Sequence, residues 1–207
     1  MLHSREESEL EFGRVLAFSD GVFAIAITLL VLSIDVPSLS GPRLDPALPD
    51  ELWDLRYQVL AYFISFGVVG LYWVRHHRLL GNLSAFDGPL MALNLFVLCF
   101  IALLPVPTEL LGEHSDQAWG IWPYALCMAL VSIGMSVLYH YARREGLLRD
   151  PPETAIERRR ESVRITFPAV VFLLSIPIAF VSPALAVCTW VGGPIVRAVL
   201  QRRPASS

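Results

Sequence analysis

An aspartate lies inside the first long apolar segment of the chain. Asp20 follows Arg14, Phe18 and Ser19, and no further charged residue occurs before Asp35. Placing an ionised carboxylate in hydrocarbon is costly unless it is paired or hydrated, so such residues usually mark a functional site. The chemistry open to Asp20 is a proton relay, an ion path or a polar clamp between helices.

Candidate partners for Asp20 close the second apolar segment, in the run Arg75-His76-His77-Arg78. Arg14 itself lies about 9 Å from Asp20 along a helix axis and on another face, so a direct pair within one helix is not expected. Two interpretations stay open: an interhelical clamp, or a proton relay, since a histidine beside an aspartate can titrate near neutral pH. No metal site is expected, because adjacent helical histidines diverge by about 100°.

A second pattern follows within the same segment. Ile25, Thr28, Leu29 and Leu32 recur at the spacing of one helix face. Most apolar stripes of this kind pack against a neighbouring helix. The alternative is a ring of stripes from several subunits, which would form a hydrophobic constriction that gates by dewetting, with a ring of Thr28 hydroxyls.

The elements that carry these residues are expected to be membrane-spanning helices. The chain is 55% hydrophobic and 17% charged, with a mean hydropathy of +0.55. Several runs reach the roughly 20 residues that a bilayer-spanning helix needs. We therefore expect an all-α integral membrane protein with one six-helix transmembrane domain over 1–207. The expected helices are 15–35, 57–74, 89–108, 119–141, 165–182 and 184–200, the last two forming a hairpin at Ser182-Pro183.

Arginine placement orients these spans. The chain has no lysine, and with six spans every arginine except Arg43 and Arg56 falls on one side. The positive-inside rule then predicts that both termini are cytoplasmic. Segment 36–56 is expected to be a proline-rich loop with at most a short turn near 50–56, and 142–164 to extend its flanking helices around Asp150-Pro151-Pro152.

Other classes of protein find little support. The chain contains no glycine-rich phosphate loop, HExxH or GxSxG motif, so no enzymatic activity is expected. Arg158-Arg159-Arg160 is flanked by Glu157 and Glu161 beside a membrane span, which favours anionic lipid or simple topology over nucleic acid. Asn94 is expected to form an interhelical hydrogen bond, and the Pro105/Pro107 pair to kink or end its helix.

These motifs resemble the transmembrane-protein-175 family of potassium channels, in its prokaryotic single-repeat form. The resemblance covers the first half of the chain. It depends on Arg14 with Phe18-Ser19-Asp20 and the run that follows to Leu30, on Tyr72-Trp73 with His76-His77-Arg78, and on Asn94 through Pro105, Pro107 and Thr108.

The resemblance implies a homotetramer in which the first helix of each subunit lines a central pore. It assigns the constriction to Ile25, with further apolar rings at Leu29 and Leu32, and selectivity to Thr28. It also implies a structural motif that ties the first helix to its neighbours, formed by Arg14, Phe18, Ser19 and Asp20 with His77 as a partner.

We therefore expect a potassium-permeable monovalent cation channel that is a multi-pass protein of the cell (inner) membrane. Its expected partners are further copies of itself and membrane lipids, with no cofactor and no metal beyond the permeant potassium ions. The alternative from another class is a proton-coupled membrane transporter that uses Asp20 and His77.

Overall fold

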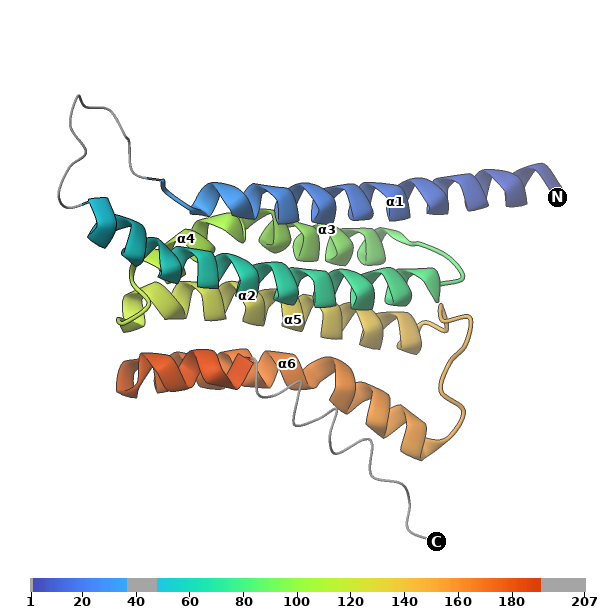
Figure 1. Cartoon of the computed structure of the whole chain (residues 1–207). Helices are drawn as coiled ribbons and strands as arrows, with labels where there is room; N and C mark the ends of the chain where they lie inside the picture. The colour runs from blue at the N-terminus through green and yellow to red at the C-terminus, as the bar shows by residue number, and fades with distance from the viewer. Residues whose placement is uncertain (1, 37–47, 191–207) are drawn as a thin grey trace, which may run out of the picture.

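A computed structural model describes residues 2–36 and 48–190, and these residues are helical apart from short connections. The long helices run roughly along one direction and alternate in sense, with the short helix that starts at Pro105 continuing the one before it (Figure 1). A further helix begins at Pro183 and continues to Trp190, where the described part ends. The main elements are α1 (Leu2–Leu29), the 3₁₀ helix η1 (Leu30–Ser33), α2 (Leu48–Gly81), α3 (Gly88–Leu103), α4 (Pro105–Glu113), α5 (Ala118–Arg144) and α6 (Ala155–Val181).

Stretches long and apolar enough to cross a membrane occur along this whole path. The described residues contain five of them: Phe12–Ser33, Leu55–Gly81, Gly88–Glu113, Ala118–Arg144 and Ala155–Val181. They correspond in order to the first five helices expected from the sequence. Most of the sixth, 184–200, lies outside the described residues. The expected hairpin at Ser182-Pro183 is present, because Trp190 returns to Phe172 of α6 with 5.7 Å between ring centroids.

Two expected boundaries were wrong. The expected loop over 36–56 ends early, because α2 already begins at Leu48. Pro49 falls in the first helical turn, where a missing N–H breaks no hydrogen bond. Likewise α1 begins at Leu2 rather than residue 15, because its polar first segment is rich in glutamate, a good helix former.

The expected break near the end of the third span is present. α3 ends at Leu103 and α4 begins directly at Pro105. Pro105 and Pro107 lack the N–H that would continue the α3 ladder, so the chain changes direction at Leu104. The Leu104 carbonyl is nevertheless used, since the Thr108 N–H donates to it over 3.1 Å.

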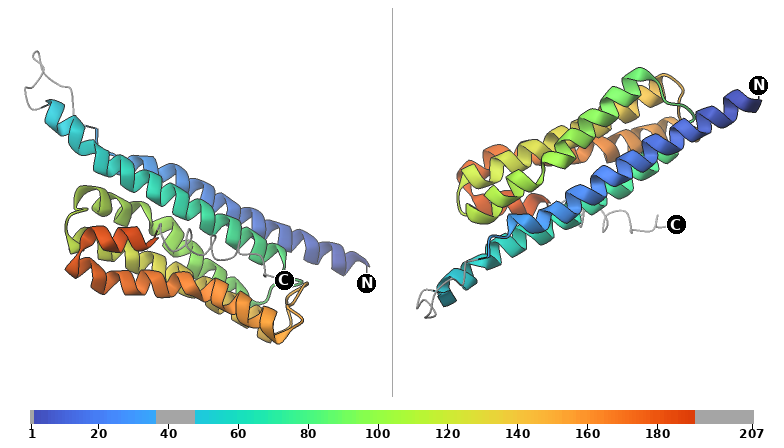
Figure 2. Two further views of the ribbon diagram at one scale, coloured as in Figure 1. Left: turned by 60° about the horizontal axis from the view of Figure 1, so that its bottom comes forward. Right: turned by 90° about the horizontal axis from the view of Figure 1, so that it is seen from above.

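α5 forms the centre of the bundle. It packs against α3, α4 and α6, and its side chains Tyr124, Met128 and Leu138 are fully buried. Gly134 permits a close approach of α3, since a Cβ there would lie 2.8 Å from Val97 Cγ2. α1 and α2 instead lie side by side at one flank, as both views of Figure 2 show, so much of α1 stays uncovered.

Two connecting loops are joined at one end of the bundle. The Ser84 N–H donates to the Leu147 carbonyl over 2.8 Å, and the Arg149 N–H donates to the Asn82 carbonyl over 2.8 Å. The Asn82 side chain adds a bond from the Asp150 N–H at 3.0 Å. The loop between α5 and α6 is thereby fixed against the loop between α2 and α3.

Candidate functional site

Asp20 meets its partners from α2. The indole Nε1–H of Trp73 donates to Asp20 Oδ1 over 2.8 Å, and His77 Nδ1 lies 3.2 Å from the same oxygen. Trp73 and His77 are one helical turn apart, so both rings reach one carboxylate. The Asp20 and His77 side chains are 34% and 45% exposed, so the site borders the outside of the subunit.

A second polar chain lies deeper and is fully buried. The Ser19 hydroxyl donates to the Val15 carbonyl over 2.9 Å and accepts a hydrogen bond from Asn94 Nδ2 at 3.0 Å. Asn94 Oδ1 lies 2.8 Å from His76 Nε2. Because the amide oxygen can only accept, His76 carries its proton on Nε2. This chain joins α1, α2 and α3 through side chains that would be costly to leave unpaired in hydrocarbon.

One atom of this buried chain has no partner. His76 Nδ1 forms no hydrogen bond within the part of the chain that the structure describes. The His76 ring packs against Phe23, with 5.1 Å between ring centroids. The fixed ring therefore wedges between the apolar side of α1 and Asn94, which sets the rotation of α1 about its own axis.

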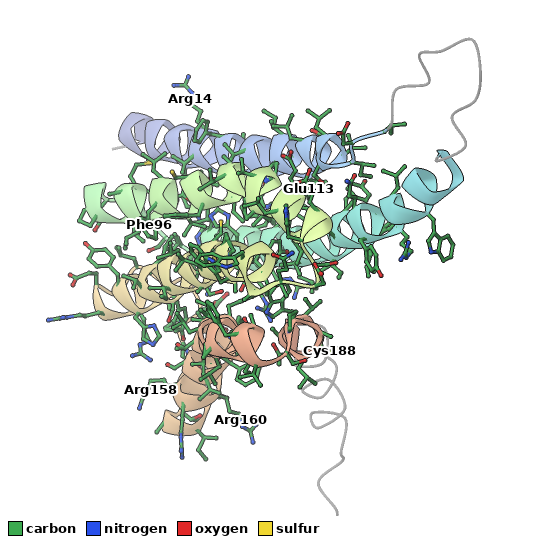
Figure 3. The ribbon with its side chains drawn as sticks, turned by 90° about the vertical axis from the view of Figure 1, so that its left-hand side faces the viewer. Arg14, Phe96, Glu113, Arg158, Arg160 and Cys188 are labelled. Atoms are coloured by element: carbon green, nitrogen blue, oxygen red, sulfur yellow. The ribbon has the colours of Figure 1, made fainter. Side chains whose placement is uncertain are left out.

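Arg14 stands apart from both polar groups. Its side chain points away from the bundle (Figure 3) and is exposed. Among the described residues it forms no ion pair with Asp20 or with α2. Phe18 lies one turn further along and is also exposed. The motif from Arg14 to Asp20 therefore has two sides: Ser19 and Asp20 bind neighbouring helices, while Arg14 and Phe18 face outward.

The apolar stripe of α1 faces outward in continuation of Arg14 and Phe18. Ile25, Leu29 and Leu32 are 61%, 40% and 72% exposed, whereas Phe23, Ala26 and Leu30 on the other side are buried. The change to 3₁₀ geometry after Leu29 keeps the stripe straight, because side chains three residues apart eclipse in a 3₁₀ helix. The Thr28 hydroxyl donates to the Ile25 carbonyl over 2.8 Å, which leaves its oxygen lone pairs available.

Sequence reasoning missed one contact of the site. A tryptophan near a helix end is typical of the membrane interface, yet the Trp73 N–H donates to Asp20. The spacing of Trp73 and His77 by one turn carried the signal, because it places two ring N–H groups on one α2 face. The expected interhelical hydrogen bond of Asn94 is present. Over the described residues no three His, Cys, Asp or Glu side chains gather closely enough to hold a metal ion.

Fold and site together define a polytopic, all-helical membrane protein with an intramembrane polar network. The family model described as "Endosomal/lysosomal potassium channel TMEM175" matches residues 14–105, which include the whole network. A protein from Streptomyces collinus named a potassium channel is 40% identical over 179 residues, covering 84% of this chain and 85% of that protein. The chain belongs to the TMEM175 family, whose members are ion channels and not enzymes.

A solved structure and a vertebrate relative extend this comparison. The crystal structure of a lysosomal potassium-selective channel TMEM175 homolog from Chamaesiphon minutus matches with a TM-score of 0.77 at 29% identity, over 93% of this chain and 98% of that chain. A Danio rerio protein named an endosomal/lysosomal proton channel is 40% identical over 105 residues, which are 48% of this chain and 20% of that protein. Relatives of this chain thus include proteins named for potassium and for protons.

Proposed function

We propose that this protein is a potassium-permeable monovalent cation channel of the cell (inner) membrane. Four copies would assemble so that α1 of each lines a central pore. The support is twofold: relatives named potassium channels match over most of the chain, and α1 carries an apolar stripe that its own subunit leaves uncovered.

The uncovered stripe is the observation that carries the proposal. Ile25, Leu29 and Leu32 would form three successive apolar rings, spaced roughly 6 Å apart by the rise of an α-helix and then of a 3₁₀ helix. A narrow apolar stretch roughly 12 Å long would shed water and so oppose the passage of a hydrated cation. Ile25, as the ring nearest the polar network, is the proposed main gate.

Orientation in the membrane follows from charge. The first half of α1, the α2–α3 loop and the α5–α6 loop lie toward one end of the bundle (Figure 1). The described arginines other than Arg56 lie in these segments or in the helical turns next to them. We assign this end to the cytoplasm by the positive-inside rule. With a sixth span over 184–200, both termini would be cytoplasmic.

Thr28 is the proposed selectivity residue. Its hydroxyl proton is engaged by the Ile25 carbonyl, so the oxygen would face the pore as an acceptor that replaces part of the hydration shell of the ion. Thr28→Ala should therefore lower the potassium-to-sodium permeability ratio by about fivefold, equivalent to ~1 kcal/mol per conducting site. Bi-ionic reversal potentials measure this ratio. Thr28→Ser is the matched control and should keep the wild-type value; an unchanged ratio in Thr28→Ala would remove Thr28 from selectivity.

A proton-coupled transporter is the second candidate, and the Asp20–His77 contact is the observation that favours it. Asp20→Asn separates the two functions, because the amide keeps an oxygen acceptor for Trp73 but cannot take up or release a proton near neutral pH. In a channel, Asp20→Asn should still pass potassium. In a transporter, it should abolish flux that depends on a proton gradient.

Reconstitution in liposomes under a potassium/sodium bi-ionic gradient tests the proposed function. If the protein is a potassium-permeable channel, the reversal potential should shift from zero toward the potassium equilibrium potential. Adding a pH gradient should not change this value. A flux that saturates with substrate and follows the pH gradient would instead establish the transporter.

A further inference from the structure

A basic pocket opens beside the loop that joins α5 to α6, away from the α1 stripe. Its volume is about 730 Å³, and it is lined by Arg143, Pro151, Pro152, Arg158, Arg159 and Ser162. Arg143 comes from the last turn of α5, the two prolines from the loop, and the other side chains from the first turns of α6. None of these residues takes part in the polar network of α1.

The pocket gathers positive charge without a compensating carboxylate. No lining residue is acidic, and three are arginines. Two glutamates on the same turns of α6 are engaged elsewhere: Glu157 forms a capping box with Thr154, and Glu161 is paired with Arg164. Three guanidinium groups around one cavity repel one another, so the arrangement suits an anionic guest.

Hydrogen-bond donors point to a phosphate group. Arg143 Nη1 donates to Ser162 Oγ over 3.2 Å, which leaves the serine proton free to donate to a guest. Arg158 uses one of its five N–H groups on the Glu153 carbonyl, at 3.4 Å. Guanidinium and hydroxyl donors around a shared cavity are the groups that bind phosphate oxygens.

The walls of the pocket are held in place before any guest arrives. The two prolines restrict the loop backbone. The residue just before them, Asp150, is fixed by Asn82, whose Oδ1 accepts from its N–H at 3.0 Å and whose Nδ2 donates to its carbonyl at 3.3 Å. A preorganised site loses less entropy on binding than a flexible loop would.

The depth of the pocket favours a lipid over a soluble ion. Arg143 lies at the end of the candidate membrane span Ala118–Arg144, and Ser162 lies within the next span, Ala155–Val181. Beyond Arg159, the exposed side chains Val163 and Phe167 follow at intervals of four residues on the same α6 face. We infer that the pocket binds the headgroup phosphate of an anionic phospholipid, with the acyl chains lying along Val163 and Phe167.

Lipid binding to the full-length purified protein in detergent tests this site. The probes are phosphatidylglycerol, neutral phosphatidylcholine, and glycerol 3-phosphate as the soluble phosphate ester, titrated by native mass spectrometry. Each arginine near a membrane surface adds to the affinity for anionic lipid, and the loss of one should weaken phosphatidylglycerol binding about fivefold. The double variant Arg143→Gln with Arg158→Gln should therefore weaken this binding about 25-fold. Phosphatidylcholine binding should not change.

The matched control also removes two arginine charges, one from the last turn of α5 and one from the first turns of α6. Arg144 and Arg160 do not line the pocket, and Arg160 leaves α6 on another side from Arg158 (Figure 3). Arg144→Gln with Arg160→Gln should keep wild-type affinity. Equal losses in both double variants, or no loss in the pocket variant, would overturn the site. Glycerol 3-phosphate binding as tightly as the lipid would overturn the assignment to a membrane lipid. If the double variant does not fold, by thermal melting, the exposed single variant Arg159→Gln with its fivefold loss replaces it.

Discussion

Replacing Ile25 with asparagine is expected to raise the potassium current about tenfold, equivalent to ~1.4 kcal/mol less barrier for ion passage. Ile25 is 61% exposed on the α1 stripe, so its replacement disturbs no contact in the core of the subunit. In the proposed tetramer the change would place four amides where four butyl groups oppose water. Wetting of the constriction would then lower the cost of ion dehydration.

Val170→Asn is the matched control for this prediction. Val170 is 46% exposed, so it resembles Ile25 in accessibility, yet it lies on α6, away from the α1 stripe. Single-channel recording in planar bilayers should give the wild-type conductance for Val170→Asn. If Ile25→Asn also conducts as the wild type does, the gate does not lie at Ile25.

Replacing Asn94 with alanine is expected to give the largest loss of stability. The side chain is fully buried and bridges Ser19 and His76, so its removal deprives His76 Nε2 of its acceptor and the Ser19 hydroxyl of its donor. At about 1–3 kcal/mol for each of the two groups that lose a partner, the free energy of unfolding should fall by roughly 2–6 kcal/mol. Unfolding in mixed micelles with increasing denaturing detergent measures this difference.

His77→Ala provides the comparison for the Asn94 prediction. His77 also contacts α1, but the contact is partly exposed and Trp73 continues to donate to Asp20. The expected loss is below about 1 kcal/mol, as for other exposed pairs. Similar losses in the two variants would mean that the buried chain through Asn94 does not hold α1 in place.

The spacing of residues in the sequence predicted which α1 side chains share a face better than it predicted which α2 side chains contact Asp20. Ile25, Leu29 and Leu32 share one side because helical periodicity requires it, and that side is the exposed one. Which ring meets Asp20 depends on how α2 is rotated about its axis. That rotation comes from packing against α1 and α4. Residue spacing alone therefore did not single out Trp73 or His77, and His77 was named as a partner only through the family resemblance.

Helix ends were the least predictable part of the fold. Hydropathy marks where a chain can lie in hydrocarbon, but α1 and α2 extend beyond that region into polar sequence. The segment from Leu48 to Arg56 contains Pro49, which suggests a loop until it is placed in the first turn of a helix. The break at Leu104 was predictable, because Pro105 and Pro107 leave few alternatives.

Cysteine accessibility during conduction tests the central claim, that the α1 stripe lines the ion path. Cys99, Cys127 and Cys188 are free thiols and would first be replaced by alanine. A cysteine introduced at Ile25 should then react with a water-soluble, charged thiol reagent, and the potassium current should be blocked. The same reagent should leave the current unchanged with a cysteine at Val170 of α6. Unblocked current with the cysteine at Ile25, or equal block at both positions, would contradict a pore lined by this stripe.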